Sequence, residues 1–337
     1  MMLSSFFQLL YLKVLVSVVV KRSKTIVYIE SLNAKGVVNS EQKSFNATII
    51  DEEIYEFITS FTKESPYYYI SVLDSSLDQG ALPTCSRDGM ASFHDISNYE
   101  SRCYRDKWSY YTSKAGLDML ERKCIKIGVD FIFSPFLILN NFFSDKIDTH
   151  KALYLLIEES YMSLMVFDNS ELLYAQHLDV EHYKDNNELF IEDNEVQNGI
   201  SPEDTIDLDE IDALDDLDDL DDFANIEDLD SLEDMDEFAQ AQEEEPIKEE
   251  KFKPSHHEDQ SLNEDYQRFL LIQSSIKNFY KDSRYKSEFI EYIYIADTIK
   301  VSRDLKKFLE EEMFLSVYVR HMDLPLEVCT MTKLELQ

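Results

Sequence analysis

An acidic segment at residues 201–250 places the strongest constraint on how this chain folds. The segment holds 24 of the 68 acidic residues of the 337-residue chain and a single lysine, Lys248. Apolar residues recur within it at every third position, a step that falls about 60° short of a full helical turn, so no apolar face persists along a helix. A segment of this composition cannot form a packed core. We therefore expect an acidic, disordered insertion between two blocks of folding sequence.

The insertion divides the chain into four predicted stretches. We expect residues 1–150 to form a first half, residues 151–200 to open a second half, residues 201–260 to be the insertion, and residues 261–337 to close the second half. The spaced apolar residues of the insertion are candidates for binding a basic, grooved partner, because acids speed encounter and apolar side chains hold the complex. The alternative is a loop that only improves solubility. The candidate partner-binding residues are Leu208, Ile211, Leu214, Leu217, Leu220, Phe223, Leu229 and Leu232.

Charge and cysteine usage exclude several classes of function. The net charge is −36, of which −23 comes from residues 201–250 and −13 from the rest of the chain. Because phosphate contacts by Lys and Arg supply most nucleic-acid affinity, we expect no DNA or RNA partner. The four cysteines are far apart and form no C-x-x-C pair, so we expect neither a zinc site nor a disulfide framework, and a reduced, cytoplasmic setting. No pattern predicts a bound metal, a cofactor or a catalytic nucleophile.

The apolar N-terminus has two interpretations. About 18 mostly apolar residues followed by Lys21, Arg22 and Lys24 are typical of a membrane anchor, although Lys13 interrupts them. The β-branched residues favour the other interpretation, a β-hairpin with strands at residues 14–20 and 25–29 and a polar turn between them. The hairpin is our expectation, and the membrane span is the minority alternative.

Hydrophobic periodicity beyond the hairpin predicts an α/β protein. We expect a third strand near residues 37–50, a helix that begins at Asp51, a strand at residues 67–73, a helix at residues 108–126, a strand at residues 131–133 and a helix capped by Ser134. A second set of three strands lies at residues 152–158, 162–168 and 171–178. After the insertion we expect a helix at residues 264–280, a strand at 289–295, a helix at 302–313 and a final strand at 314–319. Two halves are visible, each with a three-stranded meander followed by helices.

Two meander-plus-helix halves are the pattern of the actin-like (ribonuclease-H-like) fold, and one stretch narrows the comparison. Residues 164–174, LMVFDNSELLY, resemble the strand, turn and strand of the PilM/GspL family. Residues 13–45 resemble the opening meander of that family, residues 128–143 its connector into a helix, and residues 292–312 its closing strand and helix. The resemblance covers nearly all of the chain except the insertion.

The resemblance implies a cytoplasmic, actin-folded scaffold of the inner-membrane assembly platform of a type IV pilus, a type II secretion system or a DNA-uptake (competence) system. Members similar to PilM bind a nucleotide between the two halves and the short cytoplasmic tail of a single-span membrane protein. Members similar to GspL carry their own membrane span and dock onto the secretion motor. The partners implied are therefore a PilN-like membrane protein, a motor ATPase and a second copy of the chain, with a peripheral position at the inner membrane.

The residues at the nucleotide loops depart from this pattern. Backbone N–H groups reach phosphate through glycine turns, and an acid organises the metal, but the whole chain has six glycines. Lys21 stands in place of the first glycine and Val19 in place of the acid. Glu158 occupies the second acidic position, Ser160 replaces its glycine, and Ala296 and Asp297 replace the third glycine pair. We therefore expect a non-catalytic pseudo-ATPase; the alternatives are a divergent nucleotide-binding switch and an adaptor that acts through its acidic segment.

Overall fold

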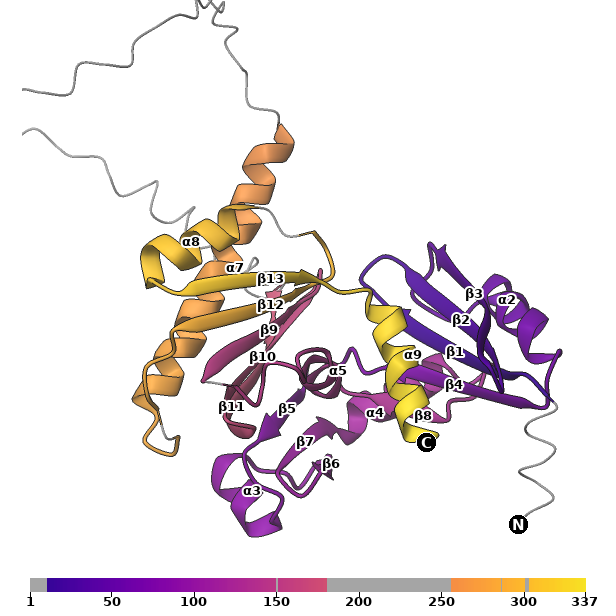
Figure 1. Cartoon of the computed structure of the whole chain (residues 1–337), viewed down its shortest axis with the longest axis horizontal. Helices are drawn as coiled ribbons and strands as arrows, with labels where there is room; N and C mark the ends of the chain where they lie inside the picture. The colour runs from indigo at the N-terminus through magenta and orange to yellow at the C-terminus, as the bar shows by residue number, and fades with distance from the viewer. Residues whose placement is uncertain (1–10, 150, 181–255, 286, 301–302) are drawn as a thin grey trace, which may run out of the picture. The chain divides into compact units, whose positions relative to one another are not determined.

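The computed structural model describes residues 11–149, 151–180, 256–285, 287–300 and 303–337. Within these residues, two five-stranded mixed sheets share the same order of strands (Figure 1). The first sheet runs β3–β2–β1–β4–β8 and the second runs β11–β10–β9–β12–β13. In each sheet an antiparallel meander precedes two strands that join in parallel. The two halves are therefore built on the same topology.

The first sheet begins with the hairpin expected from the sequence. Its strands are β1 (Lys13–Val20), β2 (Thr25–Asn33), β3 (Gly36–Phe45), β4 (Tyr67–Leu73) and β8 (Phe131–Phe133). The turn at residues 21–24 is closed by a hydrogen bond from the Lys21 backbone N–H to the Lys24 carbonyl. Helix α2 (Glu52–Thr62) begins where the sequence predicts a helix, and Asp51 is its N-cap, because the Asp51 carboxylate accepts from the Ile54 backbone N–H. The hairpin prediction for the N-terminus is confirmed.

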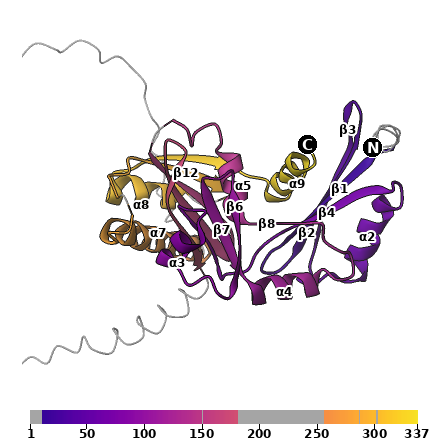
Figure 2. The ribbon, with the colours of Figure 1, turned by 90° about the horizontal axis from the view of Figure 1, so that it is seen from below.

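Alternate side chains of β1 enter two different cores. Val14, Val16 and Val18 pack with α2 and with α4 (Lys114–Lys123). The opposite face of the sheet is covered by α9 (Leu324–Glu335), which contacts β1, β2 and β4 (Figure 2). Burial on both faces explains why β1 reads as a nearly continuous apolar run. The last helix of the chain thus packs on the first sheet.

The second sheet is also covered on both faces. Its strands are β9 (Ala152–Ile157), β10 (Tyr161–Asp168), β11 (Glu171–Asp179), β12 (Tyr292–Asp297) and β13 (Ser316–His321). One face packs against α7 (His256–Lys281) and α8 (Arg303–Met313), and the other against α5 (Pro135–Phe142). Asn169 and Ser170 have positive φ angles of 45° and 70°, which suit the tight turn predicted between β10 and β11.

A small third sheet joins β5 (Gln79–Leu82), β7 (Trp108–Ser113) and β6 (Tyr99–Tyr104). Helix α3 (Arg87–Phe93) lies between β5 and β6 in the chain. The predicted helix at residues 108–126 is wrong in its first six residues, which form β7. Ser113 ends that strand and caps α4, because its hydroxyl accepts from the Gly116 backbone N–H.

The remaining elements confirm most of the sequence predictions. Ser134 caps α5, and Pro135 occupies its first turn, as predicted. Helix α9 was not predicted, and it is the main omission of the sequence analysis. Among the described residues, no helix is both long and apolar enough to cross a membrane.

Candidate functional site

An ion pair joins the two halves at the turns that follow their first strands. Lys21 follows β1, and Glu158 follows β9. The Lys21 Nζ lies 2.7 Å from the Glu158 Oε1, and the two side chains are 8 % and 2 % exposed. The sequence analysis placed these two residues at the loops of an actin-like nucleotide site, and the structure brings them together. A neutralised charge pair, shielded from water, therefore occupies the junction of the two loops.

Hydrogen bonds from backbone N–H groups close the Glu158 turn beside this pair. The Glu158 backbone N–H donates to the Tyr161 carbonyl at 3.0 Å, and the Ser160 backbone N–H donates to the Glu158 Oε2 at 3.3 Å. One Glu158 carboxylate oxygen therefore faces Lys21, and the other accepts from the Ser160 backbone N–H. In a glycine turn, such a backbone N–H would point at a bound ligand. At the third loop, Asp297 is buried at the end of β12, and its carboxylate accepts from the Ile299 backbone N–H.

Two buried rings lie next to the Glu158 turn. The Tyr161 and His177 rings are 4.8 Å apart, and the His177 Nδ1 is 2.9 Å from the Ser163 hydroxyl. Burial, followed by the nearby Glu158 and Asp74 carboxylates, raises the pKa of Tyr161 well above its ordinary value. Burial lowers the pKa of His177 to about 3, so its imidazole is neutral at physiological pH. Neither ring carries a charge that could replace a phosphate-binding lysine.

A groove of about 660 Å³ runs beside the last strand of the first sheet. Residues 128–134, which contain β8, form one wall, and Tyr110 and Thr112 of β7 contribute to another. Strand β8 pairs with β4 and is the end strand of its sheet within the described part of the chain. The edge of an end strand offers backbone N–H and C=O groups to an extended peptide. Sequence reasoning missed this groove because its walls come from segments that are distant in the chain.

The charges around this groove have mostly one sign. Its lining contains one basic residue, Arg102, and five acidic residues. The acidic residues of the lining are Asp74, Glu100, Glu121, Asp130 and Glu335. Because side chains of one sign around a concave surface attract ligands of the opposite sign, the groove suits a basic, extended segment.

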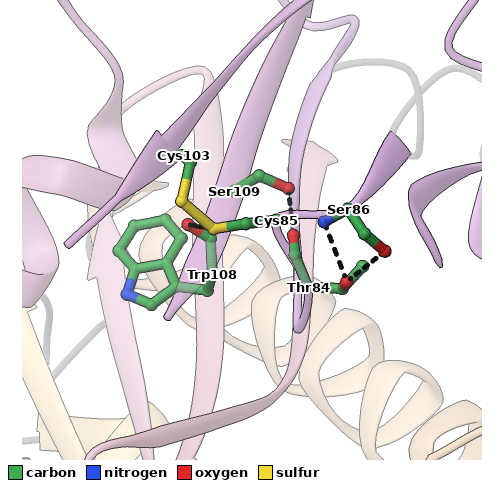
Figure 3. The surroundings of a disulfide bond; sticks show 6 residues. All are labelled: Thr84, Cys85, Ser86, Cys103, Trp108 and Ser109. Carbon is green, nitrogen blue, oxygen red and sulfur yellow. Dashed lines mark hydrogen bonds between the residues drawn. A yellow bond between two sulfur atoms is a disulfide. The ribbon is translucent and has the colours of Figure 1, made fainter. Parts of the chain in front are cut away.

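A disulfide joins Cys85 to Cys103 (Figure 3), and Cys103 follows a residue of the groove lining, Arg102. Cys103 is in β6, between Arg102 and Tyr104, whereas Cys85 lies between β5 and α3. The sequence analysis expected no disulfide framework, and the structure corrects it at this one pair of cysteines. The two cysteines are 18 residues apart, and only the fold brings their Cα atoms to 5.2 Å. The other two cysteines, Cys124 and Cys329, are free and buried.

The sequence analysis also predicted a partner-binding site in the acidic insertion. The candidate partner-binding residues of the insertion, from Leu208 to Leu232, lie outside the described residues. Their role stays a prediction.

Two halves of one strand order, each an antiparallel meander followed by two parallel strands, place the chain in the class of actin-like proteins. The chain belongs to the family described as Domain of unknown function (DUF8341), whose model matches residues 153–337. A second family model, Domain of unknown function (DUF8569), matches residues 11–140. A search of curated proteins finds no significant match.

Several solved structures are similar to the chain at low sequence identity. A chain from the PilM-PilN type IV pilus biogenesis complex is 9% identical, with a TM-score of 0.49, and the match covers 93% of this chain and 89% of that one. A Bacteroides thetaiotaomicron protein with an actin-like ATPase fold and unknown function is 10% identical, with a TM-score of 0.48, over 94% and 96% of the two chains. MreB 5 of Spiroplasma citri, bound to AMPPNP, is 8% identical, with a TM-score of 0.43, over 96% and 97%.

Proposed function

We propose that this protein is a non-catalytic actin-like scaffold that binds an extended, basic segment of a membrane protein. The Lys21–Glu158 ion pair carries the first half of this proposal. A nucleotide phosphate at this junction would have to separate the pair, and breaking a buried ion pair costs about 3–5 kcal/mol. The closed turns at Glu158 and Ser160 also direct their backbone donors inward. We infer that the junction holds the two halves together in place of a bound nucleotide.

The groove beside β8 is the proposed site for the partner. An extended segment that adds to the free edge of β8 gains backbone hydrogen bonds, and its side chains reach the walls of the groove. Cytoplasmic segments next to a membrane span are enriched in Lys and Arg, which matches the five acidic residues of the lining. The chemistry of the groove therefore favours the cytoplasmic tail of a single-span membrane protein.

The cellular machine is proposed from the resemblance of the sequence to the PilM/GspL family. We propose a peripheral position at the cytoplasmic face of the inner membrane, in the assembly platform of a type IV pilus, a type II secretion system or a competence system. The partner that occupies the groove is then a PilN-like protein. A motor ATPase and a second copy of this chain are further partners proposed on the same resemblance.

Co-purification with the PilN-like protein of the same organism tests this function. We expect the complex to survive gel filtration, and we expect charge reversal of the groove in an E121K/E335K variant to weaken it about tenfold, which corresponds to about 1.4 kcal/mol. The matched control is E311K/E312K, which makes the same charge change on α8, outside the groove lining. No complex with either the native or the control protein, or equal binding by both variants, would contradict the proposal.

A further inference from the structure

The Cys85–Cys103 disulfide ties an edge strand of the small sheet to the loop before α3. Within the described part of the chain, strand β6 pairs with β7 alone, as the end strand of this sheet. None of its six side chains is fully buried, and its ring contacts come from its two ends, Tyr99 on Tyr111 and Tyr104 on Trp108. Cys103 itself is exposed, and Cys85 is half-buried. The bond is therefore within reach of a reductant in the folded protein, and exposed disulfides are the labile ones.

Hydrogen bonds hold the Cys85 side of the disulfide independently of the S–S bond. In the loop that carries Cys85, the Ser109 hydroxyl donates to the Thr84 carbonyl at 2.6 Å (Figure 3). The Ser86 hydroxyl caps α3 by accepting from the Gly89 backbone N–H. The Cys85 Sγ lies 3.3 Å from the Trp108 carbonyl oxygen. A disulfide sulfur has no hydrogen to donate, whereas a Cys85 thiol would form a hydrogen bond with that oxygen. The Cys85 loop therefore keeps its own hydrogen bonds when the disulfide is reduced.

Strand β6 also forms a wall of the groove. Glu100 and Arg102, which flank Ser101 in this strand, line the groove, and Cys103 is the next residue. Cys103 is thus joined by a peptide bond to a residue of the groove lining. We propose that the Cys85–Cys103 disulfide is a thiol–disulfide exchange site for a dithiol reductant, and that its redox state controls how firmly β6 is held in the wall of the groove.

The exchange reaction balances with a dithiol as the reductant. A thiolate of the dithiol attacks the Sγ of Cys103, the more exposed of the two residues. The S–S bond breaks, and its electron pair leaves on the Sγ of Cys85, which takes a proton from water. The second thiol of the reductant then attacks the mixed disulfide and releases Cys103 as a thiolate, which is protonated in turn. The products are two cysteine thiols and the oxidised reductant, so two electrons and two protons pass to the protein.

The first test is native reduction of the full chain with dithiothreitol, followed by alkylation and peptide mass analysis. We expect Cys85 and Cys103 to be alkylated first. Burial raises the pKa of the Cys124 thiol to about 11 and that of the Cys329 thiol to about 12, so both should react slowly and serve as internal controls. A bond that is reduced only in denaturant would overturn the proposal.

The second test is hydrogen–deuterium exchange of oxidised and reduced protein. We expect exchange at residues 99–104 to rise about fivefold or more on reduction, within the usual range of coupling between sites, while residues 36–45 of β3 stay unchanged. The C85S/C103S variant should exchange like the reduced protein and should not respond to dithiothreitol. Equal exchange of β6 in the oxidised and reduced states would contradict the proposal, even where the bond is readily reduced.

The link from β6 to the partner rests on the proposed function. Affinity for the purified PilN-like protein should fall about fivefold or more on reduction, and this loss should be absent in C85S/C103S. If β6 loosens on reduction but neither the oxidised nor the reduced protein binds the PilN-like protein, the proposed function is wrong and the redox site stands. If the oxidised and reduced proteins bind the PilN-like protein equally, the proposed function stands and redox control of binding is wrong.

Discussion

The Lys21 Nζ lies 2.7 Å from the Glu158 Oε1, and this contact joins the turn after β1 to the corresponding turn after β9. The two residues are 137 positions apart, yet each stands at the same point of its half. A charge pair at this point holds two loops together that in a nucleotide-binding site would face a phosphate. The pair is therefore the basis of our interpretation of the fold as a scaffold.

A single substitution in this pair should destabilise the protein strongly. The Lys21→Met change leaves the Glu158 carboxylate buried without its partner, and we expect the free energy of unfolding to fall by about 3–5 kcal/mol. In the double variant K21M/E158M no charge remains, so most of that loss should be recovered. Guanidinium unfolding of the three proteins measures both effects. Equal losses in the single and double variants would show that the pair does not act as a unit.

His177 should make stability depend on pH. Its folded-state pKa of about 3 lies below the unfolded value of about 6.5, so its contribution is fully present above pH 6.5 and is lost as the pH falls towards 3. For this residue alone we expect a loss of about 2 kcal/mol between pH 7 and pH 5. The His177→Gln variant should lack this share of the pH dependence. Urea unfolding at both pH values tests it, and identical pH slopes for the two proteins would refute it.

The final helix should contribute to the stability of the first half. Met331 is 3 % exposed and packs in the core that α9 shares with α5, whereas Leu334, on the same helix, is 44 % exposed. We expect Met331→Ala to lower the free energy of unfolding by about 2–5 kcal/mol. Leu334→Ala should change it by about 0.5 kcal/mol or less. Chemical denaturation of both variants gives the comparison, and equal effects would mean that α9 is not packed as described.

The disulfide should stabilise the oxidised protein through the loop that it closes. Its cysteines are 18 residues apart, and a loop of this size corresponds to about 3 kcal/mol of unfolded-state entropy. The C85S/C103S variant should unfold at a lower guanidinium concentration than the oxidised native protein, and at nearly the same concentration as the native protein in dithiothreitol. A native protein whose midpoint does not respond to dithiothreitol would contradict this expectation.

The two meanders could be predicted because their signal is local. Buried β-branched runs such as residues 14–20, with polar turns between them, admit few other structures, and Asp51 and Ser134 mark helix starts by their own hydrogen bonds. Residues 108–113 were assigned to a helix because the helical pattern of α4 was extended through Ser113, although Tyr and Thr favour strands. Helix α9 was missed because most of its residues are apolar or β-branched and it is buried by tertiary packing.

The candidate site was predictable in part. The departures from glycine at residues 21 and 160 were visible in the sequence, but the contact between Lys21 and Glu158 depends on how the two halves pack. The groove and the Cys85–Cys103 bond depend on β6, β7 and β8, where periodicity is weak or the strands are short. Pairings between segments that are distant in the chain carry no local signal, so only the fold reveals them.

Calorimetric titration of Mg-ATP into the full chain tests the central claim, that the Lys21–Glu158 pair takes the place of a nucleotide. Our account predicts no saturable heat up to millimolar nucleotide, because a phosphate would have to break the buried pair. Saturable binding in the micromolar range would contradict the account and would identify the protein as a nucleotide-binding switch.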